Sequence, residues 1–229
     1  MKLPVISSAG DDGSACFGCT TPCCFEYVVP VNGHDLWRLT RTLAVPWTAV
    51  VSVRTTPDDW GESFTLHRGG ARQAFLLQKR PTGGCALLMS VGAAHRCGVH
   101  EARPLACRVY PLQSTWRAPT GVDFITHALC PPPQRARFEA DKGALADAVV
   151  AELHERALYL RVVARWDEAA ALQPREQPFT VDDYVRWLLS VYDALAPLRQ
   201  EAAPRASWQD AALARVSRMT LPFEWAPGC

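Results

Sequence analysis

Apolar residues recur about once per helical turn in the second half of the chain. Between Phe138 and Leu172 they occupy Leu145, Val149, Leu153, Leu158, Val162 and Trp166. This period predicts a long amphipathic helix. Thr180, followed by two aspartates, predicts the start of a second helix that ends near Leu198, because a hydroxyl and acidic side chains favour a helix N-terminus. A third helix is expected from Trp208 to Met219.

The first half instead has short apolar stretches separated by polar residues, glycine and proline. Residues 25–31 (FEYVVPV) predict a strand at a sheet edge, because Pro30 lacks a backbone donor. Residues 73–79 (QAFLLQK) and 85–91 (CALLMSV) flank a Pro-Thr-Gly-Gly segment and predict a hairpin. A further strand is expected at 122–128, a short helix at 35–43, and a loop over residues 1–24.

These elements predict an α+β fold whose character changes at three consecutive prolines, residues 131–133. We expect residues 1–133 to form a small cysteine-rich metal-binding domain of short strands and loops. Residues 134–229 are expected to form a helical region packed on it. The cysteines support this division, because eight of the nine lie between residues 16 and 130.

Composition excludes several classes of protein. The 24 basic and 23 acidic side chains give a formal charge of +1, so nucleic acid is not an expected partner. No apolar run approaches the roughly 20 residues of a membrane-spanning helix. The first residues lack the apolar segment of a secretory signal. We therefore expect a cytoplasmic protein with reduced thiols, in which clustered cysteines indicate metal binding or redox chemistry.

The cysteine spacing indicates a metal site. The first four form a C-x2-C-x3-C-C motif at Cys16, Cys19, Cys23 and Cys24. A C-x2-C pair folds tightly and offers two sulfurs to one metal, whereas adjacent side chains generally diverge. One of the pair 23–24 is therefore expected to ligate, and its neighbour to serve a second site, a partner or nothing. Eight cysteines suffice for two four-thiolate sites, or for one site with spare thiols. The ninth, Cys229, is terminal and is expected to be a mobile thiol.

Thiolates are soft ligands that suit zinc or iron–sulfur clusters. A zinc site can replace a sulfur with a histidine, for which His95 and His100 are candidates. An iron–sulfur cluster needs no histidine. We favour an iron–sulfur cluster of the [4Fe–4S] type, with Zn²⁺ as the alternative.

Two arginines lie within the second cysteine motif. Four thiolates carry net negative charge, which Arg103 and Arg108 can offset, or they can hold an anionic ligand beside the metal. The alternative for either arginine is a surface ion pair with Glu101.

The opening C-x2-C-x3-C-C motif and the later C…E-x-R-P-x-x-C-R-x-Y-P motif (residues 97–111) together resemble the YkgJ-type cysteine-cluster family. These are described as zinc- or iron-chelating proteins, and flagellin lysine-N-methylases share the cluster. The resemblance covers roughly residues 16–133. It implies metal ligation by Cys16, Cys19, Cys23, Cys24, Cys85, Cys97, Cys107 and Cys130.

The resemblance also implies two functions. In the first, the metal protein modifies a protein or peptide substrate, as a methyltransferase-like enzyme does. S-adenosylmethionine would be its cosubstrate, although the sequence carries no motif for it. In the second, the chain is a non-catalytic zinc-binding structural or interaction module. No catalytic residue is assigned.

Overall fold

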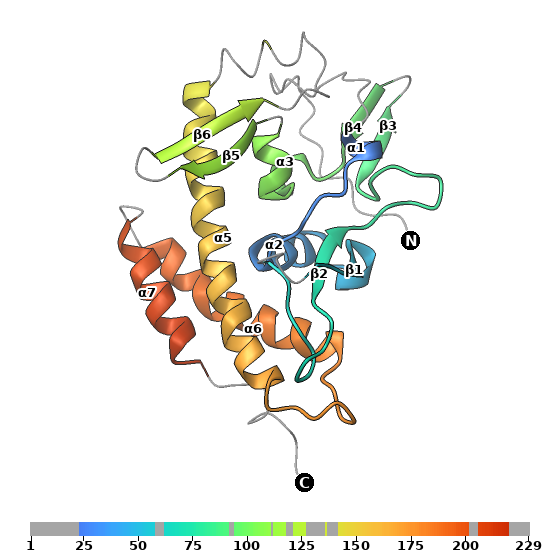
Figure 1. Ribbon diagram of the computed structural model, residues 1–229. Helices are drawn as coiled ribbons and strands as arrows, with labels where there is room; N and C mark the ends of the chain where they lie inside the picture. Colours follow the sequence, from blue (N-terminus) through green and yellow to red (C-terminus); the bar gives the residue numbers. More distant parts are fainter. Residues whose placement is uncertain are drawn as a thin grey trace. The chain divides into compact units, whose positions relative to one another are not determined.

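The computed structural model describes residues 23–57, 62–91, 94–110, 112–117, 121–126, 136, 142–201 and 206–219. Helices alternate with short strands, so the fold is α+β, as predicted (Figure 1). The chain divides into two compact units that interleave along the sequence. The cysteine unit comprises residues 1–30, 38–51 and 77–152, and the helical unit comprises residues 31–37, 52–76 and 153–229. The predicted boundary at residue 133 lies outside the described residues and stays a prediction.

Short elements make up most of the described cysteine unit. They are a one-turn helix α1 (Cys23–Glu26), strands β3 (Leu88–Val91) and β4 (Ala94–Cys97), helix α3 (Leu105–Val109), and strands β5 (Leu112–Arg117) and β6 (Gly121–Thr126). Two 3-10 turns, Trp47–Ala49 and His100–Ala102, complete the set. β3 pairs antiparallel with β4, and β5 with β6. β6 confirms the strand expected near 122–128.

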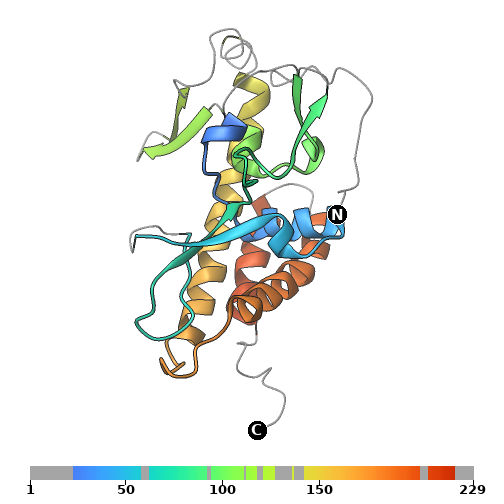
Figure 2. The same ribbon diagram turned by 90° about the vertical axis from the view of Figure 1, so that its right-hand side faces the viewer.

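The remaining elements include the longest helices. They are α2 (Gly33–Leu43), the paired strands β1 (Val51–Thr55) and β2 (Gln73–Leu77), α5 (Lys142–Ala170), α6 (Val181–Glu201) and α7 (Ala206–Ser217) (Figure 2). The four predicted helices are therefore confirmed. α6 begins with the expected cap: the Thr180 hydroxyl accepts the Asp183 N–H at 3.1 Å, and the Asp183 carboxylate accepts the Thr180 N–H at 2.9 Å.

The strand expected at residues 25–31 is wrong. Residues 23–26 form a helical turn, and residues 27–29 are neither helix nor strand. The helical turn has donors for its carbonyl groups, because the Lys79 ammonium donates to the carbonyls of Cys24 and Phe25 at 3.0 and 2.8 Å. Pro30 lies between two residues that do bond, since Val29 accepts from Leu77 and Val31 donates to Phe75, both at 2.9 Å.

The hairpin expected between residues 73 and 91 is correct only at its turn. Gly83 and Gly84 have φ angles of +82° and +71°, the left-handed region that glycine adopts without strain. The flanking strands find other partners, because β2 pairs with β1 and β3 pairs with β4. Across the turn the ladder is reduced to an isolated bridge between Lys79 and Cys85.

Aromatic side chains form the core of the helical unit. The ring of Tyr184 lies 3.8 Å from that of Phe64 and 4.9 Å from that of Trp166, measured between centroids. All three side chains are fully buried. The Tyr184 hydroxyl donates to the Tyr159 hydroxyl at 3.2 Å, which gives one buried phenol a partner. Helices α5 and α6 are joined by this cluster.

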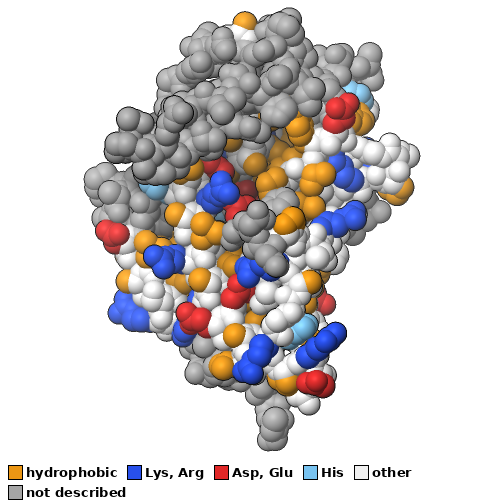
Figure 3. Space-filling model, in the orientation of Figure 1, with side chains coloured by type: hydrophobic (Ala, Val, Ile, Leu, Met, Phe, Trp, Pro, Cys, Tyr) orange, Lys and Arg blue, Asp and Glu red, His pale blue; other side chains and the backbone are white. Residues whose placement is uncertain are grey.

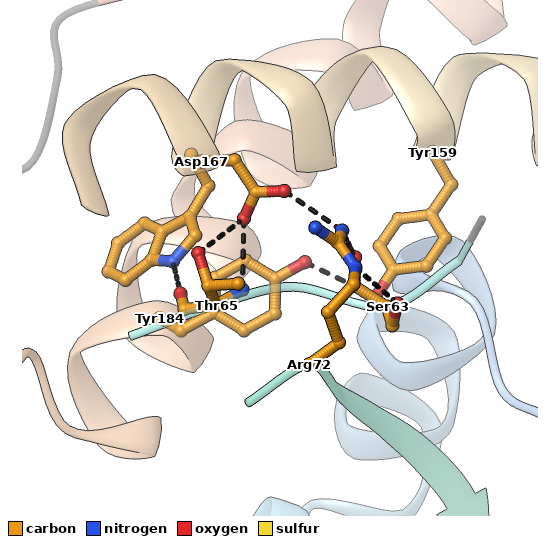
Figure 4. Close-up of polar contacts among 7 residues, drawn as sticks. Ser63, Thr65, Arg72, Tyr159, Asp167 and Tyr184 are labelled. Atoms are coloured by element: carbon orange, nitrogen blue, oxygen red, sulfur yellow. Dashed lines mark hydrogen bonds and ion pairs between the residues drawn. The ribbon is translucent and has the colours of Figure 1, made fainter. Parts of the chain in front are cut away.

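A polar clamp fixes the loop between β1 and β2 to α5 (Figure 4). The Asp167 carboxylate accepts the Thr65 backbone N–H at 2.9 Å and an Arg72 guanidinium N–H at 2.9 Å. Arg72 Nε also donates to the Ser63 hydroxyl at 2.7 Å. Both members of the ion pair have a second partner, Thr65 for Asp167 and Ser63 for Arg72. We therefore interpret the network as structural.

The described surface agrees with the balanced composition. In Figure 3, Lys and Arg side chains are interspersed with Asp and Glu side chains over the described part of the visible face. Among the described helices, none combines the length and apolar character needed to cross a membrane.

Gly33 is held in a tight contact at the start of α2. A Cβ atom there would lie 2.5 Å from Cε2 of Tyr192 and 2.9 Å from Cδ1 of Leu188. Both partners are buried residues of α6, so neither can move away at low cost.

We predict that Gly33→Ala destabilises the protein by about 1–3 kcal/mol, because overpacking the helical unit outweighs the alanine preference of a helix. Thermal unfolding followed by circular dichroism measures the change. Thr42→Ala, at an exposed position of the same helix, is the control and is expected to leave the melting temperature nearly unchanged. An unchanged melting temperature for Gly33→Ala would contradict the packing described here.

Candidate metal centre

The turn α1 places Cys24 beside the Gly83–Gly84 turn. The Cys85 backbone N–H donates to the Cys24 carbonyl at 2.7 Å, and Lys79 donates to the same carbonyl at 3.0 Å. A helix as short as α1 cannot bond its last carbonyls internally, so these two donors replace the missing helical partners. The backbone of Cys24 is therefore fixed to the segment that carries Cys85.

The glycine turn brings the chain close to α1. The Arg80 N–H donates to the Gly84 carbonyl at 2.9 Å, which closes the turn. A Cβ at Gly84 would lie 3.2 Å from the Phe25 ring and would also require a left-handed backbone. The left-handed backbone favours glycine at this position, and the absence of a Cβ leaves room for the Phe25 ring.

Cys85 and Cys97 lie at the same end of one small sheet, opposite the connection between its two strands. Cys97 pairs with Leu88 at the end of β4, and Cys85 precedes β3 by three residues. The Gly98 N–H donates to the Leu87 carbonyl at 2.8 Å and extends the pairing past Cys97. The sheet thus holds both cysteines on neighbouring chain segments.

Both cysteines accept a backbone hydrogen bond from the residue two positions later. The N–H of Leu87 bonds to the Cys85 sulfur, and the N–H of Val99 bonds to the Cys97 sulfur. Hydrogen bonds of this kind favour the thiolate over the thiol. In a metal site they also orient the ligand and stabilise its charge.

The electrostatics of the thiols show that three of them are neighbours. Burial raises the pKa of Cys97 to about 11, and the thiols of Cys85 and Cys24 raise it further. Burial also raises the pKa of Cys85, and Cys24 adds to this effect. A negative charge on one of these sulfurs therefore makes it harder to ionise a neighbouring one.

Cationic side chains act in the opposite direction. Lys79 and Arg80 lower the pKa of Cys85, and Arg103 lowers that of Cys97. These effects are smaller than the effect of burial, so the thiols of Cys85 and Cys97 stay protonated at neutral pH in the metal-free protein. A metal cation would reverse the balance, because it attracts all the thiolates at once and deprotonates its sulfur ligands.

This donor set fits a thiolate-binding metal. Cys24, Cys85 and Cys97 provide soft ligands, and all four described cysteine side chains are thiols rather than disulfides. Their approach is incomplete: among the described residues, no three Cys, His, Asp or Glu side chains converge closely enough to hold a metal ion. Of the other predicted ligands, Cys16, Cys19 and Cys130 and the side chain of Cys23 lie outside the described residues.

The remaining predicted residues have different environments. Cys107 lies half-buried in α3, and its ligand role stays a prediction. Arg103 is half-buried, and its carbonyl accepts a hydrogen bond from the Arg38 guanidinium. Arg108 is exposed. Glu101 lies with its carboxylate 3.6 Å from Nδ1 of His100.

The two candidate histidines have neighbours other than the described thiols. The ring of His95 meets the ring of Phe25 edge-on at 5.1 Å, and its Nδ1 lies 3.4 Å from the Ser90 hydroxyl. His100 is largely buried beside Glu101. Their use as zinc ligands stays a prediction.

Sequence reasoning missed two basic residues of this region, Lys79 and Arg80. Lys79 bonds to α1, whereas Arg80 donates to the carbonyls of Ala86, at 3.1 Å, and Leu88. One signal was available, because the pair directly precedes the predicted Pro-Thr-Gly-Gly turn and Cys85. Basic residues next to a cysteine that is expected to bind metal are candidates for charge compensation.

Comparison with known proteins gives one match. Residues 15–128 match the family model described as CxxCxxCC, putative zinc- or iron-chelating domain. A search of curated proteins and a search of solved structures found no match to the chain. The matched range includes Cys24, Cys85 and Cys97. The chain therefore belongs, through residues 15–128, to the cysteine-cluster family of zinc- or iron-chelating domains.

Proposed function

We propose that the cysteine unit holds an iron–sulfur cluster of the [4Fe–4S] type through cysteine thiolates. One observation carries this proposal: the thiols of Cys24, Cys85 and Cys97 come from separate segments of the chain and influence one another's charge. Three neighbouring thiols in a unit that matches a chelating domain are best explained as ligands of a common metal centre.

The choice of an iron–sulfur cluster over zinc rests on the type of metal ligand that the chain offers. The three coupled groups are all sulfur, and eight cysteines are enough for a cluster without a histidine. The described contacts of His95 and His100 are to Phe25, Ser90 and Glu101. A non-catalytic zinc-binding structural or interaction module is the second candidate, because the description of the family names zinc beside iron.

We assign Cys24 to this centre. Its thiol raises the pKa of both Cys85 and Cys97. The remaining ligands are proposed to come from Cys16, Cys19, Cys23, Cys107 and Cys130. Arg103 is proposed to offset the negative charge of the thiolates, because it already lowers the pKa of Cys97. Arg108 stays a prediction.

A wider role follows from the family resemblance alone. Modification of a protein or peptide substrate, with S-adenosylmethionine as cosubstrate, stays a prediction, and so does the cytoplasmic location. When bound, an iron–sulfur cluster would supply electron transfer or a Lewis-acidic iron. The protein's own residues would bind it, orient its ligands and exclude water.

We expect anaerobically purified protein to contain iron and acid-labile sulfide, with visible absorption that bleaches on reduction. Metal analysis and electron paramagnetic resonance measure this. Stoichiometric zinc without iron or sulfide would select the zinc alternative, and protein without either metal would reject both.

We predict that Cys24→Ser lowers the metal content by roughly half or more, because a four-coordinate thiolate site loses one of its bonds. Cys229→Ser is the matched control and is expected to keep the full content, since the terminal cysteine is not an expected ligand. Both variants are compared by metal per chain after anaerobic purification. Full retention of metal by Cys24→Ser would remove Cys24 from the site.

Metal binding is expected to release protons and to tighten as the pH rises. The pKa of Cys97 is about 11 in the metal-free protein, and burial also raises that of Cys85, so both thiols carry protons at neutral pH. Ligation requires thiolates, so each of the two loses a proton on binding.

Titration of Zn²⁺ into weakly buffered metal-free protein, with a pH indicator, measures this release. Chelator competition between about pH 6.5 and 8.5 is expected to show affinity increasing with pH. Cys97→Ser is expected to release fewer protons than the wild type. An affinity independent of pH over this range would show that these thiols are not ligands.

A further inference from the structure

Lys79 joins two segments that each carry a cysteine of the candidate centre. Its ammonium group donates to the carbonyls of Cys24 and Phe25 at 3.0 and 2.8 Å. Its backbone forms the isolated bridge to Cys85. Lys79 therefore contacts the segment of Cys24 through its side chain and the segment of Cys85 through its backbone.

These bonds leave little freedom between the two cysteines. The Cys85 N–H donates to the same Cys24 carbonyl at 2.7 Å, so that oxygen accepts from two donors. Helix α1 has only four residues, too few to be stable alone. Without the ammonium group, the carbonyls of Cys24 and Phe25 each lose one donor, while the Cys85 N–H still donates to the Cys24 carbonyl.

The neighbouring cation is a natural comparison. Arg80 is also close enough to Cys85 to affect its charge. However, its guanidinium donates to Ala86 and Leu88, after the turn, and not to α1. Lys79 and Arg80 therefore share a positive charge near Cys85 but differ in the segment that they hold.

We propose that Lys79 is a positioning residue of the metal centre, which fixes Cys24 relative to Cys85 by bonding the end of α1. This inference rests on the proposed metal-binding function. It concerns main-chain geometry, so the charge of the ammonium group alone does not account for it. Removing the side chain should loosen α1 and weaken metal binding, whereas removing the neighbouring charge of Arg80 should not loosen α1.

The test compares Lys79→Met, Lys79→Arg and Arg80→Met in the full-length protein. The first readout is hydrogen exchange of the Cys85 amide in the metal-free protein, which reports its bond to Cys24. The second is Zn²⁺ affinity by chelator competition, with Zn²⁺ as the probe ion. Lys79→Met is expected to speed exchange and to weaken binding by about 10- to 100-fold, the range for outer-shell partners of metal ligands.

Lys79→Arg keeps a cationic donor and should retain most of both properties. Arg80→Met should keep the protection of the Cys85 amide, even if lost charge lowers the affinity. The inference is overturned if Lys79→Met keeps wild-type amide protection, or if Arg80→Met loses as much protection as Lys79→Met. Should Lys79→Met fail to fold, Lys79→Gln, which is shorter and neutral, replaces it with the same expected outcome.

The two readouts separate this inference from the proposed function. A wild-type protein that binds neither iron nor zinc rejects the proposed function and the metal-binding half of the inference. The exchange rate of the Cys85 amide still decides the other half, whether Lys79 holds α1.

Discussion

The carbonyl oxygen of Cys24 accepts two hydrogen bonds, from the Cys85 N–H at 2.7 Å and from the Lys79 ammonium at 3.0 Å, and the described metal-binding region depends on them. A four-residue helix has no internal partners for its terminal carbonyls, and burying them without donors would cost free energy. The turn that supplies the donors also carries Cys85. The bonds that make α1 possible are thus the bonds that bring two cysteines together.

Bringing the thiols together in a buried place has an electrostatic cost. Desolvation and the mutual influence of the sulfurs oppose the ionised state, which is why the pKa of Cys97 rises to about 11. Backbone N–H groups and nearby cations offset part of this cost. The remainder is removed only by a bound cation or by protonation. In the metal-free unit the thiols of Cys85 and Cys97 are therefore protonated at neutral pH.

Local patterns predicted the helices well and the strand partners poorly. The period of α5 and the Thr180 cap are contained within short segments, so α5 and α6 were predictable. The hairpin around Gly83 and Gly84 was predicted only at its turn, because β2 and β3 pair with other strands. The cysteine motifs predicted membership of a zinc- or iron-chelating family, which the family model confirms. They did not predict the role of Lys79, because the two carbonyls that Lys79 holds lie more than 50 residues away in sequence.

The hydrogen bonds to the sulfurs of Cys85 and Cys97 come from the main chain at Leu87 and Val99. Every amino acid except proline supplies that N–H, so these donors survive almost any substitution of the side chain. Leu87 and Val99 are themselves buried, which restricts their side chains to apolar ones for packing reasons alone. Sequence drift at these two positions can therefore exchange one apolar side chain for another while the electronic environment of the sulfurs stays the same. Proline is the exception at both.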